Sequence, residues 1–168
     1  MTAVTVILVA GSRELTEPGV VPGALYDLAV NVEDGPIVVR HGACPGEKSA
    51  DQAASGWIND LGGRYEVTED PMPADWDNCA PDCPPGPGHR RRKKPGDIAH
   101  PGQRDDYCPT AGPRRNAAMV AKLPRPAYMV AFPEPGQPNY GTRNCIRLAR
   151  QAGIPVHEIP NPTQGSSS

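Results

Sequence analysis

The stretch Val4–Ala10 constrains the fold more than any other part of the chain, because its letters VTVILVA are almost all apolar or β-branched. A strand with one face in water would alternate apolar and polar residues, so this run indicates a strand covered on both faces. Such strands occur in parallel sheets that carry helices on both sides. Gly11 ends the run. We therefore expect Val4–Ala10 to be the central strand of an α/β fold.

Strands and helices alternate along the rest of the chain. Short apolar runs predict four further strands, Pro36–Arg40, Arg64–Thr68, Tyr128–Phe132 and Pro155–Ile159, of which Arg64–Thr68 is edge-like. Apolar residues at helical spacing predict helices over Pro18–Asn31, Glu47–Leu61, Pro113–Leu123 and Arg143–Ala152. Short connections between them imply right-handed crossovers. The sequence therefore predicts a Rossmann-like three-layer α/β sandwich, with a parallel sheet of about five strands in the order 3-2-1-4-5.

The predicted strand order reverses between the first and fourth strands, and ligands of such folds bind at that switch point, beyond the strand ends. Two Gly-containing loops flank it, Gly11–Arg13 and Pro133–Thr142. A third loop, His41–Gly46, follows the second strand. Helix starts with free backbone amides bind anions, so we expect these loops to form a phosphate-binding crevice.

Polar groups in these loops and beside them are the candidate ligand contacts. They are Gly11, Ser12, Arg13, His41, Gly42, Gly46, Asp51, Arg115, Asn116, Gly141 and Thr142. Arginine suits phosphate through its bidentate fork. Plain structural roles stay open for some of them: Thr142 as a helix N-cap, Asp51 as a favourable charge at a helix start, and His41 as a partner of the neighbouring loop. The catalytic role is unknown, with Arg114, Arg115, Glu134 and Glu47 as candidates.

A polar, proline-rich segment without periodicity runs from Glu69 to about Ala111 and contains an insertion at about 77–110. Such a long loop needs a reason to be ordered, and a bound metal would supply one. Its C-x3-C spacing and further Cys and His residues match the Cys₃His set of structural zinc sites. The predicted ligands are Cys79, Cys83, His89 and Cys108, with His100 as the alternative to His89. A disordered loop with free thiols is the competing interpretation.

The net charge and the composition limit the classes of partner that we expect. Net charge is −2, and although Arg90–Lys94 is a basic run, it lacks interleaved aromatic residues, so nucleic acid is an unlikely partner. The longest apolar run is far shorter than the roughly 18 residues of a membrane span, and Val4–Ala10 lacks the basic flank of a signal peptide. We expect a cytoplasmic protein with reduced cysteines, in which Cys44 and Cys145 are buried or line the site. The composition of residues 161–168 predicts a disordered tail.

Several motifs, in order, resemble a known family. They are Gly11-Ser12-Arg13, His41-Gly42, Gly46 with Ala50-Asp51, Asp75-Trp76, Gly112-Pro113-Arg114-Arg115-Asn116 with Met119, and Ala131-Phe132-Pro133 through Thr142. Together they resemble the YspA-type branch of the SLOG superfamily, which groups DprA/Smf-like and LOG-like Rossmann-like proteins. The resemblance covers most of residues 1–160 except Asn78–Tyr107, and it implies one nucleotide-binding domain there.

The resemblance also implies alternatives for function. LOG relatives are phosphoribohydrolases that cleave the base from nucleoside 5′-monophosphates, with a PGGxGTxxE signature and an arginine on the preceding helix. This chain has Gly141-Thr142, and Arg114 or Arg115 near the expected arginine, but Cys145 in place of the glutamate. We therefore expect binding of a nucleotide or nucleotide-derived molecule by a sensor, carrier or sequestering protein. An N-glycosidase of LOG type is the alternative, and DprA-like nucleic-acid binding is a third. Relatives often self-associate, so a homodimer is a further expectation.

Overall fold

The computed structural model describes residues 3–32 and 35–162, and it confirms the predicted α/β sandwich and its strand order. Five parallel strands form the main sheet in the order β3-β2-β1-β6-β7. Strand β1 (Thr5–Gly11) lies at the centre of this sheet. The other four strands are β2 (Ile37–His41), β3 (Val67–Pro71), β6 (Ala127–Phe132) and β7 (Val156–Glu158).

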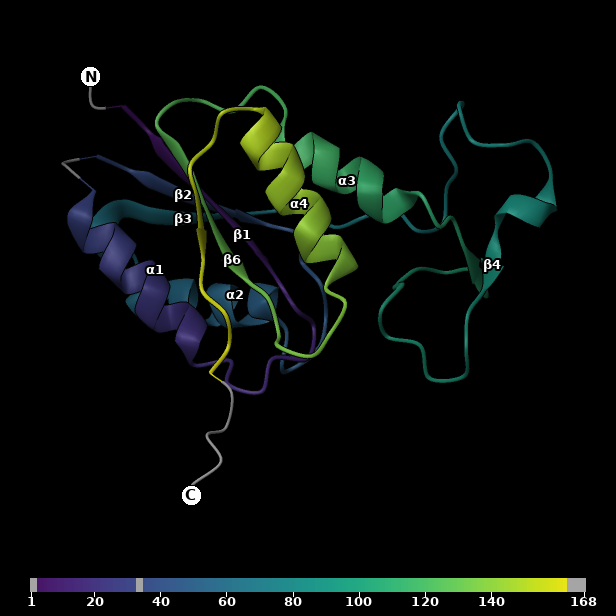
Figure 1. The fold of residues 1–168 in the computed structure, drawn as a ribbon, viewed down its shortest axis with the longest axis horizontal. Helices are drawn as coiled ribbons and strands as arrows, with labels where there is room; N and C mark the ends of the chain where they lie inside the picture. Colours follow the sequence, from purple (N-terminus) through teal and green to yellow (C-terminus); the bar gives the residue numbers. More distant parts are fainter. Residues whose placement is uncertain (1–2, 33–34, 163–168) are drawn as a thin grey trace.

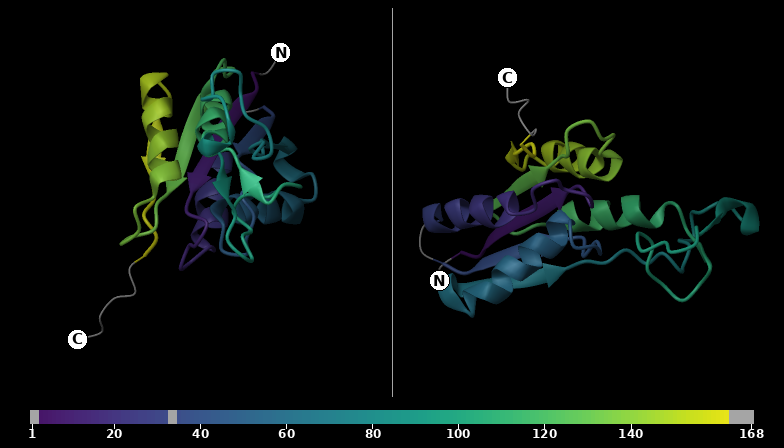
Figure 2. Two further views of the ribbon diagram at one scale, coloured as in Figure 1. Left: turned by 90° about the vertical axis from the view of Figure 1, so that its right-hand side faces the viewer. Right: turned by 90° about the horizontal axis from the view of Figure 1, so that it is seen from below.

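Two helices cover each face of the sheet (Figure 1; Figure 2). One face carries α1 (Val20–Asn31) and α2 (Ala50–Leu61), and the other carries α3 (Ala111–Val120) and α4 (Tyr140–Gln151).

Alternate residues of β1 enter the two cores, which explains why the strand is apolar along its length. Ile7 and Val9 pack with α1 and α2, while Val6 and Leu8 pack with α3 and α4. All four side chains are at most 2% exposed. Burying a side chain of this size contributes about 1.5–3 kcal/mol, so the central strand anchors both layers.

Some predicted boundaries move. The third strand starts at Val67 rather than Arg64, because Gly62 and Gly63 turn the chain with positive φ and Arg64–Glu66 forms a short 3₁₀ turn, η1. This strand does lie at the sheet edge, as expected. Helix α4 starts at Tyr140, three residues before the prediction. Helix α3 starts at Ala111 and contains Pro113 in its first turn, where proline is tolerated.

The insertion projects from the body of the sandwich on the side of α3 (Figure 1). It contains a short turn η2 (Pro87–His89) and an antiparallel pair, β4 (Arg91–Arg92) and β5 (Asp106–Tyr107). The segment is therefore folded, contrary to the disordered alternative. Part of the reason is an aromatic cluster that periodicity could not reveal: the His100 ring stacks on Tyr107 at 3.7 Å between centroids, and Trp76 meets the His100 ring edge-on at 4.6 Å.

The predicted tail begins inside the folded body. Asn161 is 2% exposed, and its side chain accepts a hydrogen bond from the Glu17 amide at 2.7 Å and donates one to the Glu17 carbonyl at 3.1 Å. This residue therefore ties the end of the chain to the loop before α1. Residues 163–168 of the predicted tail lie outside the described residues.

Gly11 ends β1 where α2 and β6 approach most closely. A Cβ added there would lie 2.5 Å from the Ala50 Cβ and 3.0 Å from the Phe132 Cβ. We expect Gly11→Val to lower the free energy of unfolding by about 1–3 kcal/mol or more through overpacking. Urea unfolding followed by tryptophan fluorescence measures this loss.

The matched control for that experiment is Gly23→Ala in α1. Apart from its chain neighbours and the backbone of the helix itself, no atom of the described residues lies within 4 Å of the added Cβ, and alanine is the better helix former by about 0.5–1 kcal/mol. This variant should be as stable as the parent or slightly more stable. Equal unfolding midpoints for Gly11→Val and the parent protein would show that the contact at Gly11 is not close.

Candidate functional site

A cavity of about 430 Å³ lies at the carboxyl ends of β1 and β6, where the strand order reverses. Its size is within the range of small-molecule sites, about 300–1,000 Å³. The walls come from the end of β1 and the loop after it, the loop after β2, and the facing parts of α2, α3 and α4. The lining residues are Val9, Ala10, Gly11, Ser12, Arg13, Glu14, Gly42, Cys44, Asp51, Arg115, Asn116, Met119, Gln137, Pro138, Asn139, Tyr140, Gly141, Thr142 and Cys145.

The N-terminus of α4 presents free backbone donors to this cavity. The amides of Tyr140, Gly141 and Thr142 find no acceptor within residues 3–32 and 35–162. No side chain caps the helix, and its N-cap is Asn139, not Thr142 as the alternative role for that threonine required. The helix dipole adds positive potential at the same place. This end of α4 therefore has the properties of an anion site.

The N-terminus of α2 differs, because its first two amides are already bonded. The Ser49 hydroxyl accepts a hydrogen bond from the Asp51 amide at 3.2 Å, and the Ala50 amide donates to the Ser12 carbonyl at 3.0 Å. The Asp51 carboxylate then accepts the Cys44 amide at 3.0 Å and places a negative charge in the first turn. An anion in the cavity is therefore favoured at α4 and not at α2.

Two arginines line the cavity, and within the described residues only one is held by other protein groups. The Arg115 guanidinium donates to the Gly42 carbonyl and, at 3.1 Å, to the Met72 carbonyl. Its Nε donates to Asn116 Oδ1 at 2.9 Å. The Arg13 guanidinium has no hydrogen bond or ion pair in the described part of the chain, so its donors are free for a ligand.

The two cavity thiols are neutral at physiological pH. Burial raises the pKa of Cys145 to about 12. Burial also raises the pKa of Cys44, helped by the Asp51 charge, while Arg115 and Arg13 act in the opposite direction. The thiolate is the nucleophilic form of cysteine, so neither residue is suited to nucleophilic catalysis.

The cavity gathers nine of the predicted ligand contacts, and two others lie outside its lining. The nine are Gly11, Ser12, Arg13, Gly42, Asp51, Arg115, Asn116, Gly141 and Thr142. His41 is 1% exposed and buried beside the cavity, with Nε2 at 2.7 Å from Glu69 and Nδ1 accepting the Ala43 amide. Gly46 serves a turn in which its carbonyl accepts the Ser49 amide at 3.0 Å.

The candidate catalytic acids do not line the cavity. Glu134 is 8% exposed and accepts hydrogen bonds from the Thr16 amide at 3.0 Å and from the Thr16 hydroxyl at 2.5 Å. It therefore joins two loops. Glu47 is exposed at the start of the α2 region. The carboxylates in the lining are instead those of Asp51 and Glu14. Glu14 was missed, although it directly follows the Gly11–Arg13 motif.

A second group of functional side chains lies in the insertion. The ligand atoms of Cys79, Cys83, His89 and Cys108 all lie within 4.8 Å of one another, so the group is close enough to hold a metal ion. The Cys83 and Cys108 sulfurs are 3.8 Å apart, and His89 Nε2 lies 3.4 Å from the Cys108 sulfur. A tetrahedral zinc site has edges of about 3.8 Å between sulfurs and about 3.5 Å between sulfur and nitrogen. These two spacings are close to that geometry.

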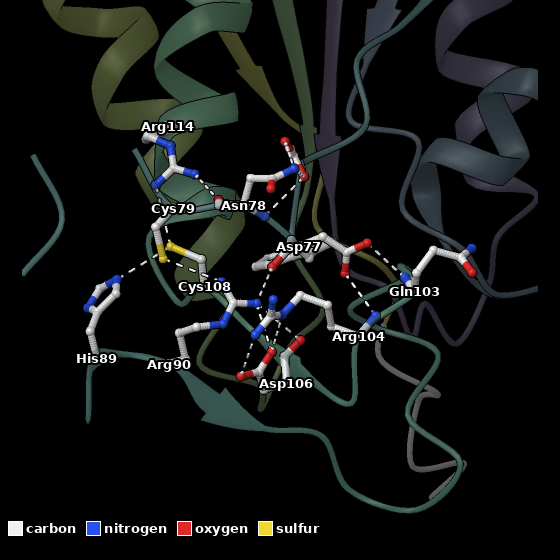
Figure 3. A network of polar contacts seen from close by, with 12 residues as sticks. Asp77, Asn78, Cys79, His89, Arg90, Gln103, Arg104, Asp106, Cys108 and Arg114 are labelled. Carbon is white, nitrogen blue, oxygen red and sulfur yellow. Dashed lines mark hydrogen bonds and ion pairs between the residues drawn. The ribbon is translucent and has the colours of Figure 1, made fainter. Parts of the chain in front are cut away.

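Two arginines contact the cysteine sulfurs (Figure 3). Arg114 donates to the Cys83 and Cys108 sulfurs at 3.5 Å and also to the Asn78 carbonyl at 3.0 Å. Arg90 donates to the Cys79 sulfur at 3.4 Å. Burial raises the pKa of Cys108, but hydrogen bonds from Thr110, Arg114 and His89 outweigh it and lower that pKa to about 5. The surroundings therefore favour the thiolate, which is the metal-binding form.

His100, the alternative ligand, lies outside this group. Its Nδ1 is 2.8 Å from an Asp97 oxygen, and its ring is held in the aromatic cluster described above. Arg114, a candidate catalytic residue, contacts the cysteine sulfurs of the Cys₃His group and does not line the cavity. The residues Arg114 and Arg115 point about 100° apart because they are consecutive on a helix.

A scan against protein-family models and a search of curated proteins found no match to this chain. Among the helices of the described residues, none has both the length and the apolar character needed to cross a membrane. The geometry of the cavity and of the Cys₃His group is therefore the basis for a functional proposal.

We expect the purified protein to carry about one metal ion per chain and the Cys108→Ser variant to lose it, because the metal needs all four ligands to close its coordination shell. Native mass spectrometry and elemental analysis measure the metal content. The matched control is Cys145→Ser, which removes a buried neutral thiol outside the group and should keep the metal. Metal retained by Cys108→Ser, or found in neither protein, would contradict the assignment.

Proposed function

We propose that the protein binds a nucleotide or a nucleotide-derived small molecule in the cavity at the ends of β1 and β6, as a sensor, carrier or sequestering protein. The observation that carries this proposal is the uncapped start of α4, where three free amides line a cavity that also contains the unpartnered Arg13 guanidinium. Backbone amides at a helix start and an arginine are the usual ligands of a phosphate group.

The remaining walls suit the rest of such a ligand. Pro138 provides exposed apolar surface in the lining, and Asn116 and Asp51 contribute polar groups. Small-molecule sites combine apolar walls with a few convergent polar groups in this way. The cavity also lies at the switch point of the sheet, where doubly wound folds bind their ligands. The motif resemblance to the SLOG superfamily supports the same ligand class.

The alternative function is hydrolysis of the N-glycosidic bond of a nucleoside 5′-monophosphate. It is favoured by one observation, namely that the Asp51 and Glu14 carboxylates line the cavity. Against it, one Asp51 oxygen is already bonded to the Cys44 amide, and Cys145 stands on α4 as a neutral thiol where the LOG signature has glutamate. We therefore place binding ahead of hydrolysis.

We infer that the metal of the insertion is zinc and that its role is structural. Three cysteines and one histidine complete a tetrahedral shell from protein ligands alone, which is typical of structural zinc sites. Zinc with three thiolates leaves a net negative charge, and the hydrogen bonds from Arg90 and Arg114 offset it. Zinc would thus order a segment that buries little apolar surface.

The binding proposal predicts that Arg13→Ala weakens the affinity for a nucleoside 5′-monophosphate by about 10- to 100-fold, because a charged hydrogen bond is worth about 1.5–3 kcal/mol. Isothermal titration calorimetry with AMP, GMP, CMP and UMP measures the affinities. Arg147→Ala, on the exposed side of α4 and outside the cavity lining, is the matched control and should bind like the parent protein. Unchanged binding by Arg13→Ala would reject the assigned phosphate position.

A second experiment distinguishes nucleotide binding from nucleotide hydrolysis. Incubation of the parent protein with the same four nucleotides should leave them intact if the protein only binds them, and chromatography would detect any free base. Base release that disappears in Asp51→Asn, while nucleotide binding persists, would establish the alternative function in place of simple binding.

A further inference from the structure

Tyr140 has an unusual place in the cavity. Among the large apolar side chains of the described residues it is the most exposed, at 82%. A lone exposed aromatic residue is ordinary on a protein surface. This one, however, is the first residue of α4, and its own backbone amide is one of the three free donors in the cavity. The ring is therefore attached at the proposed phosphate position.

Tyr140 is also free of protein partners. Its hydroxyl makes no hydrogen bond within the described ranges, and no other aromatic ring there packs against it. Other exposed tyrosines behave differently: Tyr26 and Tyr65 pack edge to face at 6.3 Å between ring centroids. The Tyr140 side chain is thus largely open to solvent beside the cavity that the residue lines.

We propose that Tyr140 is the stacking surface for the nucleobase, so that the ligand lies with its phosphate at the start of α4 and its base at the rim of the cavity. This inference rests on the proposed nucleotide-binding function and adds the orientation of the ligand. A flat aromatic ring suits a base because the two π-faces stack, whatever the base. The site would then bind ligands that carry a base more tightly than ligands without one, with little discrimination between the bases.

One neighbouring polar side chain, that of Asn139, agrees with weak base discrimination. Asn139 accepts the Glu134 amide at 3.0 Å and donates to the carbonyls of Glu134 and Gln137, both at 2.8 Å. Its side-chain amide is therefore committed to the loop and does not read a base edge. Stacking without edge contacts distinguishes bases only by the area of their rings, so purines should bind modestly tighter than pyrimidines.

The experiment compares AMP with ribose 5-phosphate, which has the phosphate and the sugar but no base. Calorimetry is done on the parent protein and on Tyr140→Ala, Tyr140→Phe and Tyr26→Ala, the last as a control tyrosine outside the cavity lining. We expect Tyr140→Ala to weaken AMP binding by about 5- to 150-fold and to leave ribose 5-phosphate binding unchanged. Tyr140→Phe, which keeps the ring, and Tyr26→Ala should both bind AMP like the parent.

Each of the remaining outcomes would contradict one specific claim. If Tyr140→Ala binds AMP as tightly as the parent, the stacking assignment is wrong while nucleotide binding stands. If Tyr140→Ala loses AMP and ribose 5-phosphate equally, the residue supports the phosphate position and not the base, and the assignment is again wrong. If the parent protein binds neither compound nor any of the other nucleotides, the proposed function itself is rejected.

Discussion

The burial of β1 on both faces is the constraint on which the rest of the structure depends. Alternate side chains of this strand enter two separate cores, so each face of the sheet needs its own pair of helices. Parallel neighbouring strands joined by helical crossovers provide these helices. The chain adds β2 and β3 on one side of β1 and then returns to add β6 and β7 on its other side. The cavity follows from this path: it lies where the loops after β1 and β6 separate, and the start of α4 faces the end of the central strand.

The difference between two helix starts decides where a ligand can bind. Helix α2 bonds its first two amides to the Ser12 carbonyl and the Ser49 hydroxyl, and it packs so close to Gly11 that no side chain fits between them. Helix α4 begins after Asn139, which turns its side chain back to the preceding loop and caps nothing. The start of α4 keeps its amides free while the first two amides of α2 are bonded, and the Arg13 guanidinium, which has no partner among the described residues, adds positive charge to the cavity.

The insertion is held by interactions that differ from those of the sandwich. Its side chains form a small aromatic cluster around Trp76 and a Cys₃His group, linked by arginines and by Asp77, which accepts the amides of Gln103 and Arg104 at 2.8 and 3.2 Å (Figure 3). Helix α3 joins this segment to the cavity, since Arg114 contacts the sulfurs and the next residue, Arg115, lines the cavity. This helix thus contributes an arginine to the surroundings of each site.

The sequence by itself determined the main strands and helices, the strand order, the glycine loops and the three cysteines of the Cys₃His group, because these depend on local periodicity and spacing. It could not decide which partner each polar side chain takes. Glu134 is bonded to Thr16, 118 positions away, and this contact removes an apparent catalytic acid from the cavity. His100 is stacked in an aromatic cluster, whereas His89 reaches the sulfurs. Only the tertiary structure settles such choices, since a side chain bonds to whatever the packed layers bring near it, and that proximity is not written in the local pattern of residues.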